Sequence, residues 1–343
     1  MPDGDVLRVL DEGLTSRNVC AAPIVVYRDG AAEYVRCGSK DERGCEACAE
    51  MFKGDVKRVI GSGCRASERD GVTAEALAGF RFYFWTLTAG SFGRTHWEGV
   101  RCFCGQEHER GSGWAGVALD PRAYDYEGQV SWNNRLGRLW NRTTSRLALD
   151  LPDAEHASVR EWQARGALHV HALVRVPDSV PDEDVRAVLA AAGEATYYGY
   201  GWGAQQDVKL IGSDDGLAHG VRYLAKALTY TVKSLGADHQ PDADALPARV
   251  RHFAAMDRAA RFFTCMHKDC GIGCPSTAHK RGGFGGHRFA KSKGWSLAGL
   301  TRSALQEERR AWAMEHAADG YGVDRLQERA VVNEAMRRLS ERV

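Results

Sequence analysis

Residues 161–175, with the sequence EWQARGALHVHALVR, decide the fold of this chain. The second half of the stretch alternates as a β-strand does, so His169 and His171 point to one face and their apolar neighbours to the other. Two imidazoles side by side on one rigid strand form half of a binding site for a divalent metal ion. Surface histidines, or buried histidines held by hydrogen bonds, are the alternative explanation of the pair.

The segments around this strand predict one antiparallel sheet. Val159–Gln163 and Ala167–Val174 form a hairpin that turns at Arg165-Gly166, and Arg81–Thr88 has the aromatic, β-branched composition of a central strand. The other predicted elements are helices at Val130–Leu149, Pro181–Ala195 and Gly216–Leu235, and a short strand at Asp207–Ile211. This order predicts an α+β fold in which a central antiparallel sheet carries helices on one face.

The charge of the chain is balanced overall and uneven locally. Forty-six Lys and Arg residues against 45 Asp and Glu residues give a net charge of +1 at pH 7, so no global field indicates a nucleic-acid partner. Residues 278–302, however, contain six cations and no acidic residue. The N-terminus lacks a signal-peptide pattern, and no segment approaches the roughly 20 apolar residues of a membrane helix. We therefore expect a cytoplasmic protein without a membrane partner.

Ten cysteines in such a chain indicate metal ligands or reduced thiols rather than a disulfide framework. Cys37, Cys45 and Cys48 have the spacing C-x7-C-x2-C, and the C-x2-C pair lets two thiolates reach one structural Zn²⁺ ion. Candidates for the fourth ligand are Cys64, Cys102, Cys104, His96 and His108. A second group contains Cys265, Cys270 and Cys274, with His267, His279 and His287 nearby in the sequence. Scattered free cysteines are the alternative for both groups.

One predicted helix carries a face suited to phosphate chemistry. Tyr223, Lys226, Tyr230 and Lys233 follow one another at steps of three, four and three residues, which aligns them along one side. A phenol becomes a useful nucleophile when a cation lowers the cost of its oxyanion, and an ammonium group binds phosphate oxygens. An ordinary amphipathic helix with packed tyrosines and solvated lysines is the alternative.

The basic segment between residues 279 and 296 mixes cations with aromatic side chains. Cations that follow phosphates, and aromatics that stack on unpaired bases, are typical of a groove for single-stranded DNA. A solvated Gly-rich loop is the alternative. The candidate DNA-binding residues are Lys280, Arg281, Arg288, Lys291, Lys293 and Trp295.

Taken in order, these motifs resemble the rolling-circle replication initiators of actinobacterial plasmids, which belong to the HUH endonuclease superfamily. The resemblance covers residues 37–302 and includes several rarer elements beside the two histidines. Its motifs are TLTAGSFG at 86–93 with His96, Cys102-x-Cys104-Gly105 with His108, Asp120-Pro121 with Tyr124-Asp125-Tyr126, Trp132 with Leu139-Trp140, Glu161-x-Gln163-x-Arg165-Gly166 with His169-x-His171, Tyr223-Leu224-Ala225-Lys226, and residues 279–296.

The resemblance implies a ferredoxin- or RRM-like HUH fold and an enzyme that nicks and rejoins one strand of plasmid origin DNA. His169 and His171 would hold Mg²⁺ or Mn²⁺, with Glu161 as the first choice for a third ligand and Gln163 as the second. A tyrosine would attack the scissile phosphate and leave a 5′-phosphotyrosine link and a free 3′-OH for a host polymerase, with a host helicase as a further partner. Lys226 would contact the phosphate.

One departure from the family pattern concerns the nucleophile. Relatives often have a second tyrosine directly after this lysine, where the present chain has Ala227. Tyr223 is the expected nucleophile because Lys226 follows it three residues later, and Tyr230 is the alternative. Two other functions stay open, namely a zinc-stabilised origin-binding protein that does not nick, and an HUH transposase or mobilisation protein.

The resemblance and the motifs together predict four parts. They are a Cys-rich, zinc-binding region at residues 1–75, an HUH core at 76–240, a basic DNA-binding segment at 241–302 and a charged helical tail at 303–343.

Overall fold

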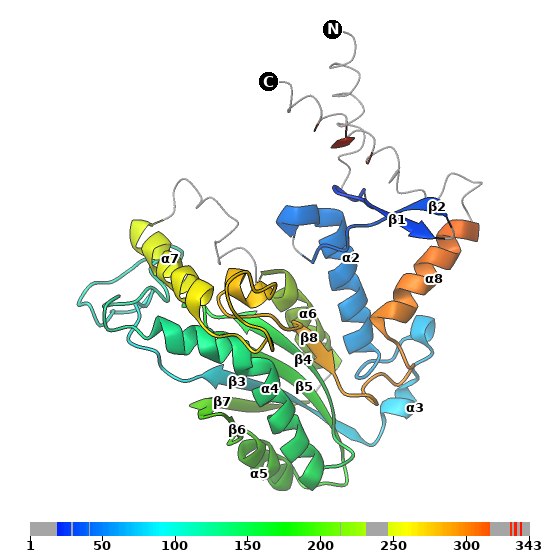
Figure 1. Ribbon diagram of the computed structural model, residues 1–343. Helices are drawn as coiled ribbons and strands as arrows, with labels where there is room; N and C mark the ends of the chain where they lie inside the picture. The colour runs from blue at the N-terminus through cyan, green and yellow to red at the C-terminus, as the bar shows by residue number, and fades with distance from the viewer. Residues whose placement is uncertain are drawn as a thin grey trace. The chain divides into compact units, whose positions relative to one another are not determined.

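The computed structural model describes residues 19–28, 30–40, 42–212, 214–230 and 246–315, and four positions between 330 and 337 (Figure 1). The chain divides into two units, one formed by Met1–Ser62 with Ser296–Val343 and the other by Gly63–Trp295. The larger unit therefore combines the expected core with most of the expected basic segment. The boundary that we expected at residue 240 does not separate these two units.

The larger unit is built on a six-stranded sheet whose neighbouring strands are all antiparallel, which confirms the predicted α+β class. The strand order is β6-β7-β3-β5-β4-β8, so β3 and β5 are central. The strands are β3 (Phe80–Ala89), β4 (Glu155–Trp162), β5 (Leu168–Pro177), β6 (Thr196–Tyr197), β7 (Tyr200–Ile211) and β8 (Phe289–Lys291). β7 is longer than the predicted strand, and the sequence did not predict β6 or β8.

The predicted hairpin is formed by β4 and β5, and its turn has a simple local cause. Gly166 adopts a φ of 82°, in the left-handed region that favours glycine. Its N–H donates to the Gln163 carbonyl at 2.8 Å, and the Gln163 N–H donates to the Ala167 carbonyl at 2.8 Å. Asn133 anchors the turn from α4 (Tyr126–Asp150), because its amide donates to the Gly166 carbonyl at 3.0 Å.

Helices cover both faces of the sheet, so the prediction of helices on one face was wrong (Figure 1). α4 and α5 (Asp182–Ala192) pack on the face that carries Val170 and Ala172. α6 (Asp214–Tyr230) packs on the opposite face, close to Leu173, which is fully buried. The physical reason is that β5 has buried apolar residues on both faces, and each face needs a cover.

The core between α4 and the sheet contains large aromatic side chains. Trp85, Trp132 and Trp140 are almost fully buried, and the indole N–H of Trp132 donates to the Leu168 carbonyl at 3.0 Å. α4 begins at Tyr126 because Asp125 caps it, accepting a hydrogen bond from the Gly128 N–H at 2.8 Å. This core holds the central strands rigidly beneath the site.

Among the residues that the structure describes, the smaller unit contains a hairpin and two helices. They are β1 (Ile24–Arg28), β2 (Ala31–Val35), α2 (Glu42–Gly61) and α8 (Arg302–Glu315). Asp55 of α2, 4% exposed, pairs with Arg309 of α8, whose Nη2 lies 2.9 Å from Oδ2. The hairpin was not predicted, whereas α2 contains the short helical piece that the sequence predicts around Glu46–Ile60. α8 begins the predicted helical tail, and most of the rest of that tail lies outside the described residues.

The remaining elements of the structure are short, apart from one helix. They are η1 (Glu68–Asp70), α3 (Ala74–Leu77), α7 (Pro247–Phe262) and η2 (Thr277–Lys280). Within the described part of the chain, no helix is both long enough and apolar enough to cross a membrane.

Candidate functional site

The hairpin brings one carboxylate and two imidazoles together. Glu161 on β4 lies directly opposite His169 on β5, and His171 follows on the same face. The Glu161 Oε2 atom lies 3.3 Å from His169 Nε2 and 3.2 Å from His171 Nε2. Neighbouring ligands of an octahedral cation are separated by about 3.0 Å, so the spacing suits a shared metal ion. These three side chains form a group that could hold such an ion.

Gln163, the second candidate for the third ligand, is placed differently. Its Oε1 accepts a hydrogen bond from Arg165 Nε at 3.0 Å, within the hairpin turn. The Arg165 guanidinium in turn donates to the Ala89 carbonyl at 3.1 Å. The Gln163 side chain is therefore hydrogen-bonded within the hairpin turn.

The protonation states in this group suit metal binding. Burial alone would raise the pKa of Glu161, but His169 and His171 in their protonated forms donate hydrogen bonds and supply positive charge, which outweigh burial and lower the pKa to about 2. Burial lowers the pKa of His171, which favours a neutral ring with a free lone pair. The carboxylate is thus ionised at neutral pH, and His171 is available as a ligand.

Thr86 holds the ring of His171 from the neighbouring strand. It pairs with His171 across β3 and β5, and its Oγ1 lies 2.9 Å from Nδ1. When Nδ1–H donates to Thr86, Nε2 keeps its lone pair on the side of Glu161. Thr86 was noted in the sequence only as part of a motif, and its role depends on the pairing of strands far apart in the chain.

Tyr223 reaches the same group from α6. Its hydroxyl lies 3.3 Å from Glu161 Oε2 and 3.3 Å from His171 Nε2. The ring packs edge-on against Phe84 and His171, and the residue keeps 38% of its surface exposed. Burial, and then the negative charge of Glu161, raise the pKa of Tyr223 to about 12. The phenol is therefore protonated at neutral pH, and a nearby cation would be needed to ionise it.

The other predicted residues of this segment follow Tyr223 along the chain. Lys226 is exposed, one turn beyond Tyr223. Ala227 is 3% exposed, on the packed side of the helix. The Tyr230 side chain lies outside the described residues, as does Lys233.

The predicted zinc ligands divide into separate groups. Cys37, Cys45 and Cys48 are joined by Cys20, which the sequence did not suggest because it lies 17 residues before Cys37 and outside any C-x2-C pair. The Cys48 Sγ atom lies 3.6 Å from those of Cys37 and Cys20. The structure therefore brings none of the predicted fourth-ligand candidates into this group.

Those candidates are found elsewhere in the chain. Cys102 and Cys104 lie together with His96 and His108. Cys64 belongs to no group among the described residues, and burial raises its pKa to about 12.

The second cysteine group predicted from the sequence does form a cluster. Cys265, Cys270 and Cys274 lie together with His279. His267 and His287, which are also near them in the sequence, are not part of this group.

The candidate DNA-binding residues differ in their exposure to solvent. Trp295, expected to stack on bases, is fully buried, with the Arg175 guanidinium 5.6 Å from its ring centre. Arg288 donates to the Leu228 carbonyl of α6 at 3.0 Å, and Lys291 is half-buried in β8. The exposed candidates are Lys280, Arg281 and Lys293. A tryptophan in a basic segment can pack in a core or stack on DNA, and the sequence alone does not distinguish these.

The fold and the site define an α+β protein with several groups of side chains that could bind metal ions. Comparison with known families identifies it further. The model of the RepSA family, described as the replication initiator protein of pSAM2, matches residues 26–338, and the chain belongs to this family. This confirms the resemblance to plasmid replication initiators. Initiators of this kind bind the DNA of a replication origin.

A relative supports the same assignment. A replication initiator protein of Streptomyces ambofaciens is 30% identical over 340 residues, which cover 82% of this chain and 71% of that protein. No solved structure matches the chain.

Proposed function

We propose that this initiator nicks and rejoins one strand of plasmid origin DNA in the manner of HUH endonucleases, with Tyr223 as the nucleophile. The observation that carries the proposal is the position of the Tyr223 hydroxyl, 3.3 Å from both Glu161 Oε2 and His171 Nε2. A nucleophile beside a metal-binding group is the arrangement that phosphoryl transfer requires.

In the proposed step, the Tyr223 oxygen forms a bond to the scissile phosphorus, and the bond from phosphorus to the 3′ oxygen breaks. The phenolic proton passes to water, because the Glu161 carboxylate, whose pKa is lowered to about 2, is a weak base and is assigned to the metal ion. The departing 3′ oxygen takes up a proton and becomes the 3′-OH from which a host polymerase extends. Lys226, one turn further along α6, binds a phosphate oxygen. The 5′-phosphotyrosine link conserves the free energy of the cleaved phosphodiester bond, so the strand can be rejoined later without another energy source.

We propose Mg²⁺ or Mn²⁺ as the ion held by Glu161, His169 and His171. Bound there, it would stabilise negative charge on the phosphoryl oxygens and on the phenolate. The donor set of one carboxylate and two imidazoles accepts both ions and suits Mn²⁺ better, because Mg²⁺ prefers oxygen ligands. We also propose a structural Zn²⁺ ion at Cys20, Cys37, Cys45 and Cys48.

The test is incubation of the full-length protein with Mn²⁺ and single-stranded origin DNA, followed by denaturing electrophoresis and peptide mass spectrometry. We expect an adduct on Tyr223 that is absent in Tyr223→Phe and His169→Ala. Tyr230→Phe and Tyr198→Phe should retain the adduct, the latter as a control tyrosine that is 80% exposed. An adduct on Tyr230 alone would contradict the assignment of the nucleophile.

Origin binding without nicking is the second candidate function. The observation that favours it is Ala227, a small residue where relatives often have a second tyrosine. Metal-dependent DNA binding without an adduct on any tyrosine would support this function and refute the first.

A further inference from the structure

Two groups of Cys and His residues in the larger unit lie outside the Glu161 site. The first contains His96, Cys102, Cys104 and His108, and the second contains Cys265, Cys270, Cys274 and His279. With the four cysteines of the smaller unit, these groups include nine of the ten cysteines in the chain. Such a distribution is unlike that of scattered free thiols.

The distances within both groups match a tetrahedral zinc site. In the first group, His96 Nδ1 lies 3.1 Å from His108 Nε2, and Cys104 Sγ lies 3.3 Å from His108 Nε2. In the second, Cys270 Sγ lies 3.6 Å from His279 Nε2. Zn–N and Zn–S bonds of about 2.0 and 2.3 Å place tetrahedral ligands about 3.3–3.8 Å apart.

The histidines in both groups are held in orientations suited to zinc binding. His279 Nδ1 lies 2.9 Å from the Ala260 carbonyl, so Nδ1–H donates to it and Nε2 faces Cys270 with a free lone pair. In the first group, Trp114 stacks on His108 at 4.9 Å between ring centres.

We propose that each of these two groups binds one Zn²⁺ ion, and that the two ions brace the turn of the β4–β5 hairpin. The hairpin carries the Glu161 site, so this role is a positioning role and involves no contact with substrate. The proposal on zinc binding is independent of the proposed nicking activity.

Contacts of α7 connect the first zinc group to the hairpin turn. At its beginning, Arg249 donates to the Ala115 carbonyl in the loop of the first group at 3.2 Å. His252 Nδ1 accepts from the Ala118 N–H at 3.3 Å, so its Nε2–H donates to the Arg165 carbonyl in the turn at 3.1 Å. The loop of the first group is also packed directly on this turn at Gly116.

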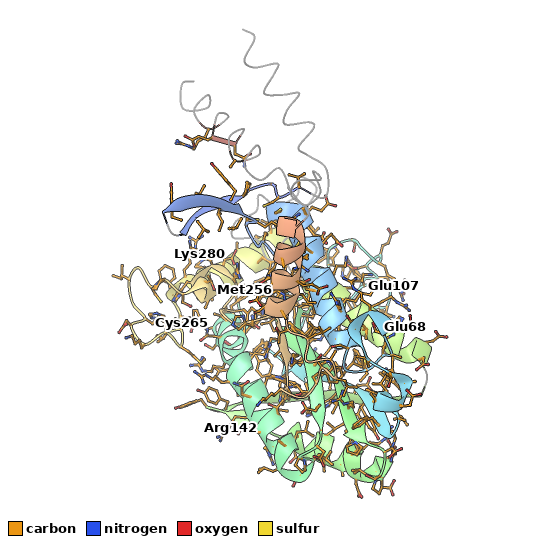
Figure 2. The ribbon with its side chains drawn as sticks, turned by 90° about the vertical axis from the view of Figure 1, so that its right-hand side faces the viewer. Glu68, Glu107, Arg142, Met256, Cys265 and Lys280 are labelled. Carbon is orange, nitrogen blue, oxygen red and sulfur yellow. The ribbon has the colours of Figure 1, made fainter. Side chains whose placement is uncertain are left out.

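The second zinc group follows the end of α7, where Figure 2 labels Cys265 beyond Met256. Its loop is tied to α4, because Asn134 accepts from the Met266 N–H at 3.0 Å and donates to the Gly283 carbonyl at 2.9 Å. The neighbouring Asn133 binds both this loop, at the Gly282 carbonyl, and the hairpin turn. Loss of either ion would therefore loosen a segment that packs around the turn.

The first experiment measures zinc in the full-length protein purified without chelators. X-ray absorption of the wild-type protein should show nitrogen as well as sulfur around zinc, in a ratio near three nitrogens to nine sulfurs over three sites. The group in the smaller unit contains cysteines alone, so nitrogen ligands come from the two proposed groups or from zinc bound at His169 and His171, and the variants described below separate these sources. A zinc shell made of sulfur alone would overturn the proposal without the need for any variant.

Variants then assign the ions to their sites. Cys104→Ala and Cys270→Ala should each lose one zinc ion per chain by mass spectrometry of metal content. Cys64→Ala is the matched control, since Cys64 is a buried cysteine of the same unit outside every group, and it should lose none. Unchanged zinc content in both test variants would refute the assignment of the ligands.

Hydrogen exchange tests the bracing role separately. In Cys104→Ala and Cys270→Ala, the amides of Gln163 and Gly166 should exchange about tenfold faster or more, because the turn opens more often. Unchanged exchange in variants that have lost zinc would refute the bracing role. Neither measurement depends on nicking, so a failure here is distinct from a failure of the proposed function.

Discussion

Replacement of Thr86 by valine tests whether the His171 ring is held ready for a metal ion. The substitution keeps the shape of the side chain and removes the hydroxyl that lies 2.9 Å from His171 Nδ1. His171 then loses the partner that fixes its tautomer, while its ring contacts with Phe84, His169 and Tyr223 remain. The ring should therefore stay in place but select the wrong tautomer more often.

The expected magnitude follows from the single hydrogen bond that is lost. Removal of a partner that orients a metal-binding histidine weakens metal affinity by about 10- to 100-fold, which corresponds to roughly 1.4–2.7 kcal/mol. Because three aromatic contacts still restrain the ring, we expect a value near the lower limit. Mn²⁺ binding measured by isothermal titration calorimetry gives the number directly, and the proposed nicking activity should recover at high Mn²⁺ concentration.

Thr88→Val is the matched control. Thr88 lies two residues further along β3, and its hydroxyl donates to the Gln205 carbonyl at 2.6 Å, away from the histidines. The Thr88→Val variant loses a hydrogen bond of similar strength, worth about 1 kcal/mol of stability, and should leave Mn²⁺ affinity unchanged. Equal Mn²⁺ affinities in wild type and Thr86→Val would refute the reasoning, and so would an equal loss in both variants.

Three further predictions concern stability and DNA binding. Trp295→Ala should lower the free energy of unfolding in urea by about 3–5 kcal/mol, because the indole is fully buried; a normal stability with weakened DNA binding would show that the ring faces DNA instead. Gly116→Ala should cost about 2–4 kcal/mol, since φ is 78° and the new methyl group would collide with the hairpin backbone. Gly111 has a similar φ and open space around it, so Gly111→Ala should lower the free energy of unfolding clearly less. Equal losses in the two variants would contradict the predicted collision at Gly116. Lys280 is exposed, and Lys280→Ala should reduce the slope of log K for origin binding against log salt concentration by about one, measured by fluorescence anisotropy. An unchanged slope would show that this lysine does not contact the DNA.

The sequence was sufficient where the relevant contacts are local. The hairpin of β4 and β5 is read from a period of two and a glycine turn, and both signals lie within residues 155–177. Once that hairpin forms, its register places Glu161 opposite His169 without help from the rest of the chain. The helices α4, α5 and α6 were predicted for the same reason, because their apolar spacing is a local pattern.

Contacts between distant segments could not be predicted in this way. Cys20 lies far from the other cysteines of its group and has no spacing motif. β8 is a three-residue edge strand in a Gly-rich segment, which is too short to show a period. The burial of Trp295 depends on Arg175 and on the close approach of Gly63, both remote in the sequence.

The sequence by itself thus determined the class of fold, the family and the two histidines on one face of a strand, and it left Glu161 and Gln163 as alternatives for a third ligand beside them. Tertiary structure decided that Tyr223, 52 residues beyond His171, lies at that site, and that Thr86, 85 residues before His171, holds the ring. It also divided nine of the ten cysteines among three groups. The physical reason is that a repeating pattern specifies a strand or helix and its buried face, whereas packing of the whole sheet and its two layers of helices specifies which faces meet.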